Sequence, residues 1–413
     1  MTDARGLDDA PWLRSGPAAR VLTLLNGHGE EARVIGGAVR NALLHVPIGD
    51  IDIATTALPT EVIRRAKAAG IKSVPTGIDH GTVTLVVDSH PFEITTLRED
   101  IETYGRHAKV MFGRDWRRDA ERRDFTMNAL SASRDGTIHD YVGGVEDIAA
   151  RRVRFIGDAA MRIAEDYLRI LRFFRFHAAY GEGAPDPEGV AACIGGRAGL
   201  GELSRERVRM ELIKLIAARH AVPALAAMTE AGLLDRVLGG VPLLASCANL
   251  IKLEAAVALA PDPIRRLGAL AVFVPEDAER LRDRLRLANA EYDRLASIAD
   301  GWWHVSQRAG ERGGRALLYR LGPERFTDRV LVAWARSPEG AVDRPWHSLA
   351  TLPARWTAPS FPLKAADLLA RGVPKGPRLG AALRAAEEAW IAADFPHDAM
   401  AVAAIAEAAL RAG

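Results

Sequence analysis

The chain has 413 residues, of which 48% are hydrophobic and 26% are charged, and its formal net charge at pH 7 is +2. This length exceeds one ordinary hydrophobic core and predicts two to four domains. The composition excludes a disordered protein, and no run of about 20 apolar residues is present to cross a bilayer. A net charge so close to zero does not by itself favour nucleic-acid binding. Evidence for such binding must therefore come from local clusters of charged residues.

The chain contains two cysteines, Cys193 and Cys247, which lie far apart in the sequence. This spacing predicts two buried thiols and neither a disulfide framework nor a metal site. Residues 1–9 carry acidic side chains and no apolar segment of the kind found in secretory signals. Together these features predict a cytoplasmic protein.

Residues up to about 141 predict a mixture of strands and helices. We expect helices at 17–27, 38–44 and 59–69, and strands at 32–35, 50–54, 82–87 and 92–97. The last two strands should form a hairpin with Asp88 to Pro91 as its turn. Residues 98–121 mix charges with two glycines and show little apolar periodicity, so they predict a mobile loop without regular structure.

After residue 154 the strand pattern disappears. From Ala159 onward, apolar residues recur at spacings of three and four, which predicts one helix after another. Breaks are expected at 181–187, 195–201, 261–263 and 337–362. The predicted fold class is therefore α+β, with a small mixed α/β head followed by a long all-helical remainder in about three parts.

The first segment with chemical meaning joins Gly36, Gly37 and Arg40 to Asp50 and Asp52. Because side chains alternate along a strand, the two aspartates should share one face. Neighbouring carboxylates repel each other, and Mg²⁺ held together with substrate phosphates relieves that repulsion. Two such ions can activate an attacking hydroxyl and stabilise a leaving pyrophosphate. The aspartate pair alone is typical of a solvated strand end, but this combination predicts a metal-dependent nucleotide site.

The two glycines add a cradle for the triphosphate. They allow backbone N–H groups to approach it closely at the N-terminus of a helix, where the helix dipole favours anions. Arg40 would add positive charge at the β- or γ-phosphate. A third carboxylate, Glu93, alternates with Phe92 and Ile94. If those two residues fill the core, Glu93 faces the site, although an exposed strand glutamate would look the same in the sequence.

Residues 36–55, together with Thr76 to Thr82 downstream, resemble the class II CCA-adding enzymes and the bacterial poly(A) polymerases. Both belong to the polymerase-β-like nucleotidyltransferase superfamily. The segment from Arg122 to Ala129 resembles the second motif of this family. The resemblance implies that Asp124 accepts hydrogen bonds from ribose hydroxyls and that Arg123 meets the sugar-phosphate.

The segment from Arg162 to Arg175 resembles the motif with which this family selects nucleotides. On one continuous helix, Asp166 and Arg169 would be i,i+3 neighbours and would present an acceptor beside a fork of donors. Cytosine and adenine match that pair, whereas uracil and guanine leave buried groups unpaired. Arg172 and Arg175 would then meet triphosphate or primer phosphates. Elsewhere, the same pattern usually means an ordinary helix with ion pairs.

Further segments resemble other parts of these enzymes. Residues 98–121 correspond to a flexible loop that helps the pocket change from CTP to ATP, 141–148 to a hinge, and 203–212 to a buttressing helix. Residues 361–380 resemble the tail. The sequence departs from the family at Asn41 and His45, and Asn41 puts an ion pair near Arg40 in doubt.

The resemblance implies a catalytic head at 1–142, a neck with the nucleotide-selecting helix at 143–222, a helical body at 223–335 and a tRNA-binding tail at 336–413. The predicted function is template-independent addition of CCA to the tRNA 3′ end from CTP and ATP with Mg²⁺. The catalytic residues would be Asp50, Asp52 and Glu93, with the two aspartates also binding metal. A poly(A) polymerase, an enzyme that adds only part of CCA, and a non-catalytic RNA-binding protein remain alternatives.

Overall fold

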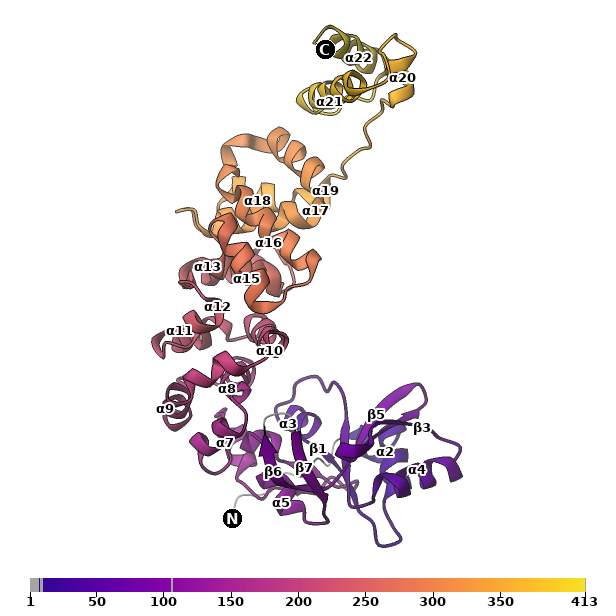
Figure 1. The fold of residues 1–413 in the computed structure, drawn as a ribbon, viewed down its shortest axis with the longest axis vertical. Helices are drawn as coiled ribbons and strands as arrows, with labels where there is room; N and C mark the ends of the chain where they lie inside the picture. Colours follow the sequence, from indigo (N-terminus) through magenta and orange to yellow (C-terminus); the bar gives the residue numbers. More distant parts are fainter. Residues whose placement is uncertain (1–6, 8–9, 105–106, 413) are drawn as a thin grey trace. The chain divides into compact units, whose positions relative to one another are not determined.

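The computed structural model describes residues 7, 10–104 and 107–412 (Figure 1). Its internal contacts divide the chain into two compact units, Met1–Val237 and Leu238–Gly413. Within the described residues, no helix combines the length and apolar character needed to cross a membrane. The four-part division predicted above is finer than these two units, and its boundaries stay a prediction.

The first unit contains a seven-stranded sheet in the order β3-β4-β5-β2-β1-β8-β9. The strands are β1 (Ala32–Ile35), β2 (Asp52–Thr55), β3 (Lys72–Gly77), β4 (Thr82–Val87), β5 (His90–Thr96), β8 (Ser131–Ala132) and β9 (Ile138–His139). Only β2 and β5 pair in parallel. Fully buried side chains such as Ile53, Leu85 and Ile94 form part of its core.

In the first unit, helices alternate with the strands at first, and after β9 the elements are all helical. They are α1 (Pro11–Arg14), α2 (Pro17–Leu25), α3 (Gly37–Leu43), α4 (Pro59–Ala68), α5 (Trp116–Glu121), α6 (Gly144–Ala149), α7 (Ala159–Glu165), α8 (Leu168–Tyr180), α9 (Pro187–Gly195), α10 (Arg205–Ala217), α11 (Ala221–Glu230) and α12 (Leu234–Leu238). Short 3₁₀ turns occur at η1 (Ile78–His80), η2 (Thr126–Asn128) and η3 (Arg197–Glu202). Proline begins several of these helices, since its missing N–H costs nothing at the first helical position.

Two details of the predicted strands differ in the structure. The predicted strand 50–54 begins only at Asp52, so Asp50 lies just before β2. The β4–β5 turn is also tighter than expected, because only Asp88 and Ser89 separate the strands. Both residues have positive φ, at 49° and 65°. Positive φ at both central residues is the signature of a type I′ turn, which matches the twist of a hairpin.

The prediction that residues 98–121 lack regular structure is wrong. Strands β6 (Arg98–Tyr104) and β7 (His107–Phe112) form a separate two-stranded antiparallel sheet, and α5 follows. Arg98 pairs with Phe112 in this ladder, which contains an irregularity between Asp100 and Glu102. Two strands can satisfy each other's backbone groups without a marked apolar pattern, so periodicity gave no signal.

The second unit is helical throughout its described residues. Its elements are α13 (Leu244–Ala256), α14 (Pro263–Ala271), α15 (Pro275–Leu285), α16 (Asn289–Gly301), η4 (Trp302–His304), η5 (Gln307–Ala309), α17 (Gly310–Ala335), α18 (Arg344–Ala350), α19 (Leu352–Arg355), α20 (Ala365–Leu369), α21 (Pro377–Ala392) and α22 (Ala399–Ala412). Gly322, with φ of 74°, kinks α17 before Pro323. The predicted α+β class is confirmed.

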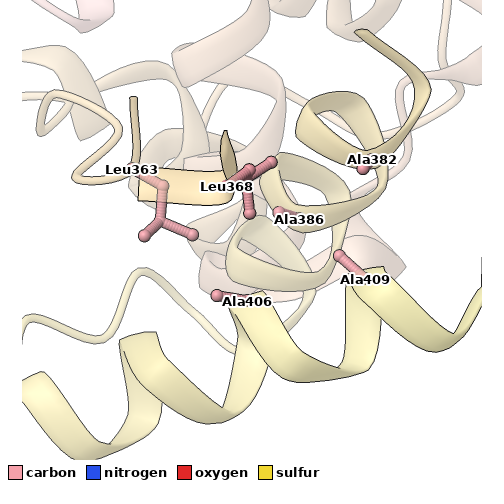
Figure 2. Close-up of a cluster of buried hydrophobic side chains, with 6 residues drawn as sticks. All are labelled: Leu363, Leu368, Ala382, Ala386, Ala406 and Ala409. Atoms are coloured by element: carbon pink, nitrogen blue, oxygen red, sulfur yellow. The ribbon is translucent and has the colours of Figure 1, made fainter. Parts of the chain in front are cut away.

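The last three helices have a small core of their own. Figure 2 shows Leu368 of α20 near two alanine pairs, Ala382 and Ala386 of α21 and Ala406 and Ala409 of α22. Alanine adds little bulk, so α21 and α22 can approach each other closely. The alanine-rich composition near the C-terminus therefore reflects tight helix packing.

Candidate active site

Three carboxylates gather where β2 and β5 begin to pair. These strands run in parallel with Ile53 opposite Ile94. Asp52 and Glu93 each precede one of these residues, so they lie side by side on the opposite face. Both acidic residues are exposed, whereas Ile53 and Ile94 are buried. Asp50 is close enough to act on Asp52: burial, Glu93 and Asp50 together raise the pKa of Asp52.

The glycines lie beside these carboxylates. Ile35, the last residue of β1, pairs with Asp52, and α3 begins two residues later. Gly36 has φ of 64°, a left-handed conformation that favours glycine. A Cβ at Gly36 would lie 3.5 Å from the carbonyl oxygen of Asn128. The glycine turn, Gly36–Gly37, thus brings the unpaired N–H groups at the start of α3 next to the carboxylates.

Asp124 is held on both sides of its carboxylate. Its Oδ1 accepts from the backbone N–H of Phe125 at 2.9 Å and from Nδ2 of Asn128 at 3.2 Å. Its Oδ2 accepts from Nε of Arg172 at 2.7 Å. Asp124 is 9% exposed. The predicted ribose contact therefore requires either the remaining acceptor capacity of this carboxylate or a rearrangement of its partners.

Arg123 lies next to the glycine turn. Its Nη1 is 3.8 Å from the position that a Cβ on Gly36 would take, and its Nη2 is 2.9 Å from Oδ2 of Asp119. Burial would raise the pKa of Asp119, but Arg123 and Arg122 outweigh it and hold that pKa below its usual value. Asp119 therefore stays ionised and fixes Arg123 beside the turn; its predicted contact with the sugar-phosphate stays a prediction.

The prediction that Asp166 and Arg169 share one continuous helix is wrong. Helix α7 ends at Glu165, and Asp166 has an extended backbone with φ of −156°. Oδ1 of Asp166 accepts from the backbone N–H of Leu168 at 3.1 Å, which is the behaviour of a residue that caps the start of α8. Aspartate favours such caps over helix interiors, a preference that the spacing argument overlooked.

The two predicted base-selecting side chains have separate partners in this structure. Asp166 forms a salt bridge of 2.6 Å with Arg207 of α10. Arg169 pairs with Glu165 and donates to the carbonyl oxygen of Arg162 at 2.8 Å. Their proposed contact with the base therefore stays a prediction, and it would require a change of partners.

The predicted phosphate-binding arginines of α8 also have acidic partners. Arg172 pairs with Asp124, and Arg175 lies 2.7 Å from Oε2 of Glu211. Glu211, on α10, is 3% exposed and lies 3.7 Å from Arg172. Sequence reasoning assigned no role in the site to Glu211, because its partners lie 36 and 39 positions earlier in the chain.

Arg40, which the sequence predicted to contact a phosphate, is buried, with 6% of its surface exposed. It donates to Asn128 and to the hydroxyl of Tyr180. The sequence analysis assigned neither partner a role. Asn128 could have been noticed because it lies inside the motif from Arg122 to Ala129, but no local signal marks Tyr180.

The donor set suits a divalent cation that is shared with a substrate. Among the described residues, no three His, Cys, Asp or Glu side chains are gathered into a ready-made metal site. Asp50, Asp52 and Glu93 form no ion pair with another described residue. Arg123 offsets burial and this mutual repulsion only in part, so the pKa of Asp52 stays raised. Oxygen ligands of this kind fit a hard cation that takes its remaining ligands from phosphates.

Paired aspartates beside a glycine turn on a small mixed sheet are the arrangement of a nucleotidyltransferase. Residues 32–154 match the family model described as "Poly A polymerase head domain", and residues 186–247 match "Probable RNA and SrmB- binding site of polymerase A". The chain is 36% identical to the mitochondrial CCA tRNA nucleotidyltransferase 1 of Homo sapiens over 87% of this chain and 82% of that protein. It is 32% identical to the CCA-adding enzyme of Limosilactobacillus fermentum over 89% and 90% of the two chains.

A solved structure agrees with these relatives. The CCA-adding enzyme of Bacillus stearothermophilus in complex with CTP superposes with a TM-score of 0.77 at 30% identity, covering 94% of this chain and 96% of that one. The chain belongs to the class II CCA-adding enzymes of the polymerase-β-like nucleotidyltransferase superfamily.

Proposed function

We propose that this chain adds or restores the 3′-terminal CCA of tRNA, using CTP and ATP without a nucleic-acid template. The observation that carries the proposal is the placement of Asp52 and Glu93 side by side on paired strands, next to the glycine turn. Full-length similarity to enzymes named for CCA addition supports the choice of substrate over other nucleotidyl transfers.

Mg²⁺ is the cation we propose for this site, held by Asp50 and Asp52. Their neighbouring carboxylates already raise the pKa of Asp52, so a cation would stabilise the ionised forms. When bound, such ions would activate the 3′-hydroxyl of the tRNA and neutralise charge on the leaving pyrophosphate. The accessible position of the carboxylates at a strand start leaves room for substrate oxygens.

The other site residues would hold the nucleotide. The backbone N–H groups at the start of α3, which begins two residues after the partner of Asp52, would bind the triphosphate. Glu93, beside Asp52 on the neighbouring strand, adds a third carboxylate to this face of the sheet. Arg123, fixed by Asp119, can meet the sugar-phosphate, and Asp124 can accept from a ribose hydroxyl.

Base selection is proposed for Asp166 and Arg169 at the start of α8. A carboxylate accepts from the exocyclic amino group of cytosine or adenine, and a guanidinium donates to the adjacent ring nitrogen. Uracil and guanine present the reverse pattern, so each would leave a buried group unpaired at a cost of about 1–3 kcal/mol. For Asp166 to make this contact, it would exchange Arg207 for the base.

The tail at 336–413 is proposed to bind tRNA, within the four-part division predicted from the sequence. Lys375 and Arg378 flank Gly376, the residue before α21, and can contact RNA phosphates. The cytoplasmic location predicted from the two thiols also stays a prediction.

A labelling assay distinguishes the alternatives. Each NTP is supplied separately to tRNA lacking CCA, to tRNA lacking only its terminal adenosine, and to an unrelated RNA. We expect two C and then one A on tRNA, and no U or G. Addition of C alone or A alone would indicate a partial enzyme, repeated A on unrelated RNA a poly(A) polymerase, and no incorporation a non-catalytic RNA-binding protein.

A further inference from the structure

Arg40, four residues after Gly36, uses most of its donors inside the protein. Its Nη1 donates to Oδ1 of Asn128 at 2.5 Å, and its Nη2 donates to the Tyr180 hydroxyl at 2.7 Å. Nε and Nη2 also donate to Oδ1 of Asn41, at 3.1 and 2.8 Å. A guanidinium has five N–H groups, so little capacity remains for a phosphate.

The contact with Tyr180 joins two elements that carry different parts of the site. Arg40 belongs to α3, which begins at the glycine turn, whereas Tyr180 is the last residue of α8. The guanidinium carbon lies 4.0 Å from the centroid of the Tyr180 ring and 5.4 Å from that of Phe176, so stacking accompanies the hydrogen bond. Arg40 thereby attaches the triphosphate-binding end of the head to the helix that begins next to Asp166.

A second chain of contacts leads from Arg40 to the same helix. Asn128 accepts from Arg40 and donates through Nδ2 to Oδ1 of Asp124 at 3.2 Å. Oδ2 of Asp124 is 2.7 Å from Nε of Arg172, which lies one turn from the start of α8. Helix α8 is therefore connected to Arg40 twice, directly at its last residue and indirectly near its first turn.

The guanidinium also lies against the glycine turn itself. A Cβ at Gly37 would be 3.6 Å from Nη2 of Arg40. The backbone N–H of Arg40 also donates to the carbonyl oxygen of Gly36 at 3.0 Å, so a shift of Arg40 would move the turn proposed to bind the triphosphate. Reacting groups must be held to within a fraction of an ångström for efficient transfer, so this contact bears on the rate of the reaction.

We propose that Arg40 is a tether between the glycine turn and α8, with Tyr180 and Asn128 as positioning residues, and is not a phosphate ligand. The proposal rests on the proposed function, because it assigns the turn to the triphosphate and the start of α8 to the base. It replaces the role that the sequence suggested for Arg40. A tether keeps the distance between base selection and phosphate binding fixed while nucleotides exchange.

The test compares Tyr180→Phe, Arg40→Lys and the double variant in the full chain. Phenylalanine keeps the ring and removes only the hydroxyl, and lysine keeps the charge but cannot reach three acceptors at once. Tyr319→Phe is the matched control, because it removes a hydroxyl bonded to Glu387 in the other unit. Steady-state kcat and KM are measured for CTP on tRNA lacking CCA and for ATP on tRNA lacking the terminal adenosine.

We expect Tyr180→Phe to lower kcat roughly tenfold, the size expected for one hydrogen bond to a charged group, with little change in the KM for either nucleotide. The double variant should lose little more than Arg40→Lys alone, because both changes break the same link. Tyr319→Phe should match the wild type. If Tyr180→Phe lowers the melting temperature, Asn128→Ser is used instead. It interrupts the second chain of contacts, from Arg40 through Asn128 to Asp124, and should show the same loss of kcat.

Three results would overturn the tether. Wild-type kcat in Tyr180→Phe would show that the link is unnecessary. Multiplying losses in the double variant would show that the two residues act independently. A raised KM with unchanged kcat in Arg40→Lys would indicate a phosphate ligand instead. In each case the wild type still adds CCA, whereas a wild type that adds neither C nor A overturns the proposed function, and the tether with it.

Discussion

Two acidic clusters, one in each unit of the chain, are arranged in opposite ways. In the first unit, Asp52 and Glu93 lie on two paired central strands of the sheet, with Asp50 just before the first of them, and none of the three forms an ion pair with a described residue. In the second unit, Asp328 is fully buried, yet its two oxygens accept from Nε of Arg265 at 2.9 Å and from Nε of Arg294 at 2.7 Å.

A second buried carboxylate of this cluster is also paired with arginines. Glu254, 1% exposed, accepts from Arg265 at 3.1 Å and from Arg266 at 2.8 Å. Buried charges of this kind are tolerated only when they are paired and hydrogen-bonded. The paired cluster joins helices of the second unit, whereas the unpaired one is where we propose that a cation and a substrate bind.

Removal of one unpaired carboxylate should have the largest effect on activity. We expect Asp52→Asn to reduce nucleotide incorporation by roughly 10²–10³-fold or more, the range seen when a group that stabilises transition-state charge is lost. Its melting temperature should not fall, because the change removes repulsion from Glu93 and Asp50. Asp293→Asn, an exposed residue of the other unit, is the control. A marked loss of stability in Asp52→Asn would break the comparison.

Removal of one paired carboxylate should do the reverse. Asp328→Asn removes the buried carboxylate that Arg265 and Arg294 share and leaves Arg265 with Glu254 and Arg294 with Asp262. The loss should cost about 3 kcal/mol of unfolding free energy, the lower end of the range for a broken buried pair. Urea unfolding measures the loss, and incorporation by the fraction that remains folded should stay near the wild-type level. Asp300→Asn breaks a long surface pair with Arg329 and should cost about 0–1 kcal/mol. Equal stability of the Asp328 and Asp300 variants would contradict this reading.

Asp166 lies between these extremes, since it is paired with Arg207 and yet proposed to select bases. Asp166→Ala should lower the preference for CTP over UTP by roughly 10–100-fold, which corresponds to one lost buried hydrogen bond. Competition between the two nucleotides on tRNA lacking CCA measures this ratio. An unchanged ratio, with lower stability, would place Asp166 among the purely structural carboxylates.

The two thiols should show no difference between the units. Burial raises the pKa of Cys247 to about 12 and also raises that of Cys193. Thiolates are the reactive species, so neither cysteine should react with iodoacetamide at roughly pH 8 in the native chain, and both should react in denaturant. Labelling of one thiol in the native chain would show that its unit opens locally.

The sequence predicted those parts of the fold and site that depend on local patterns. The helical remainder follows from apolar spacing. The shared face of Asp52 and Glu93 follows from the alternation of side chains along strands. The turn at Gly36 and Gly37 follows from the conformational freedom of glycine. The strands within residues 98–121 were not predicted because backbone pairing can form strands without an apolar pattern. The helix boundary at Asp166 was not predicted because an i,i+3 spacing of Asp and Arg occurs both inside helices and at helix caps.

The contacts that organise the site could not be predicted in the same way. Arg40 and Tyr180 are 140 positions apart, Asp124 and Arg172 are 48 apart, and Asp166 and Arg207 are 41 apart. No property of one residue in these pairs specifies the other. Only the packing of α8 against the head and α10 brings them together, so the prediction that the site arginines meet phosphates did not account for these partners.

A crystal structure of the full chain with CTP and Mg²⁺ is the most direct test of the central claim. The metal should lie between the carboxylates of Asp50 and Asp52, in contact with the triphosphate, and the cytosine should face Asp166 and Arg169. A nucleotide bound away from the two aspartates, or a triphosphate held by arginines without a metal beside them, would contradict the role assigned to the unpaired cluster.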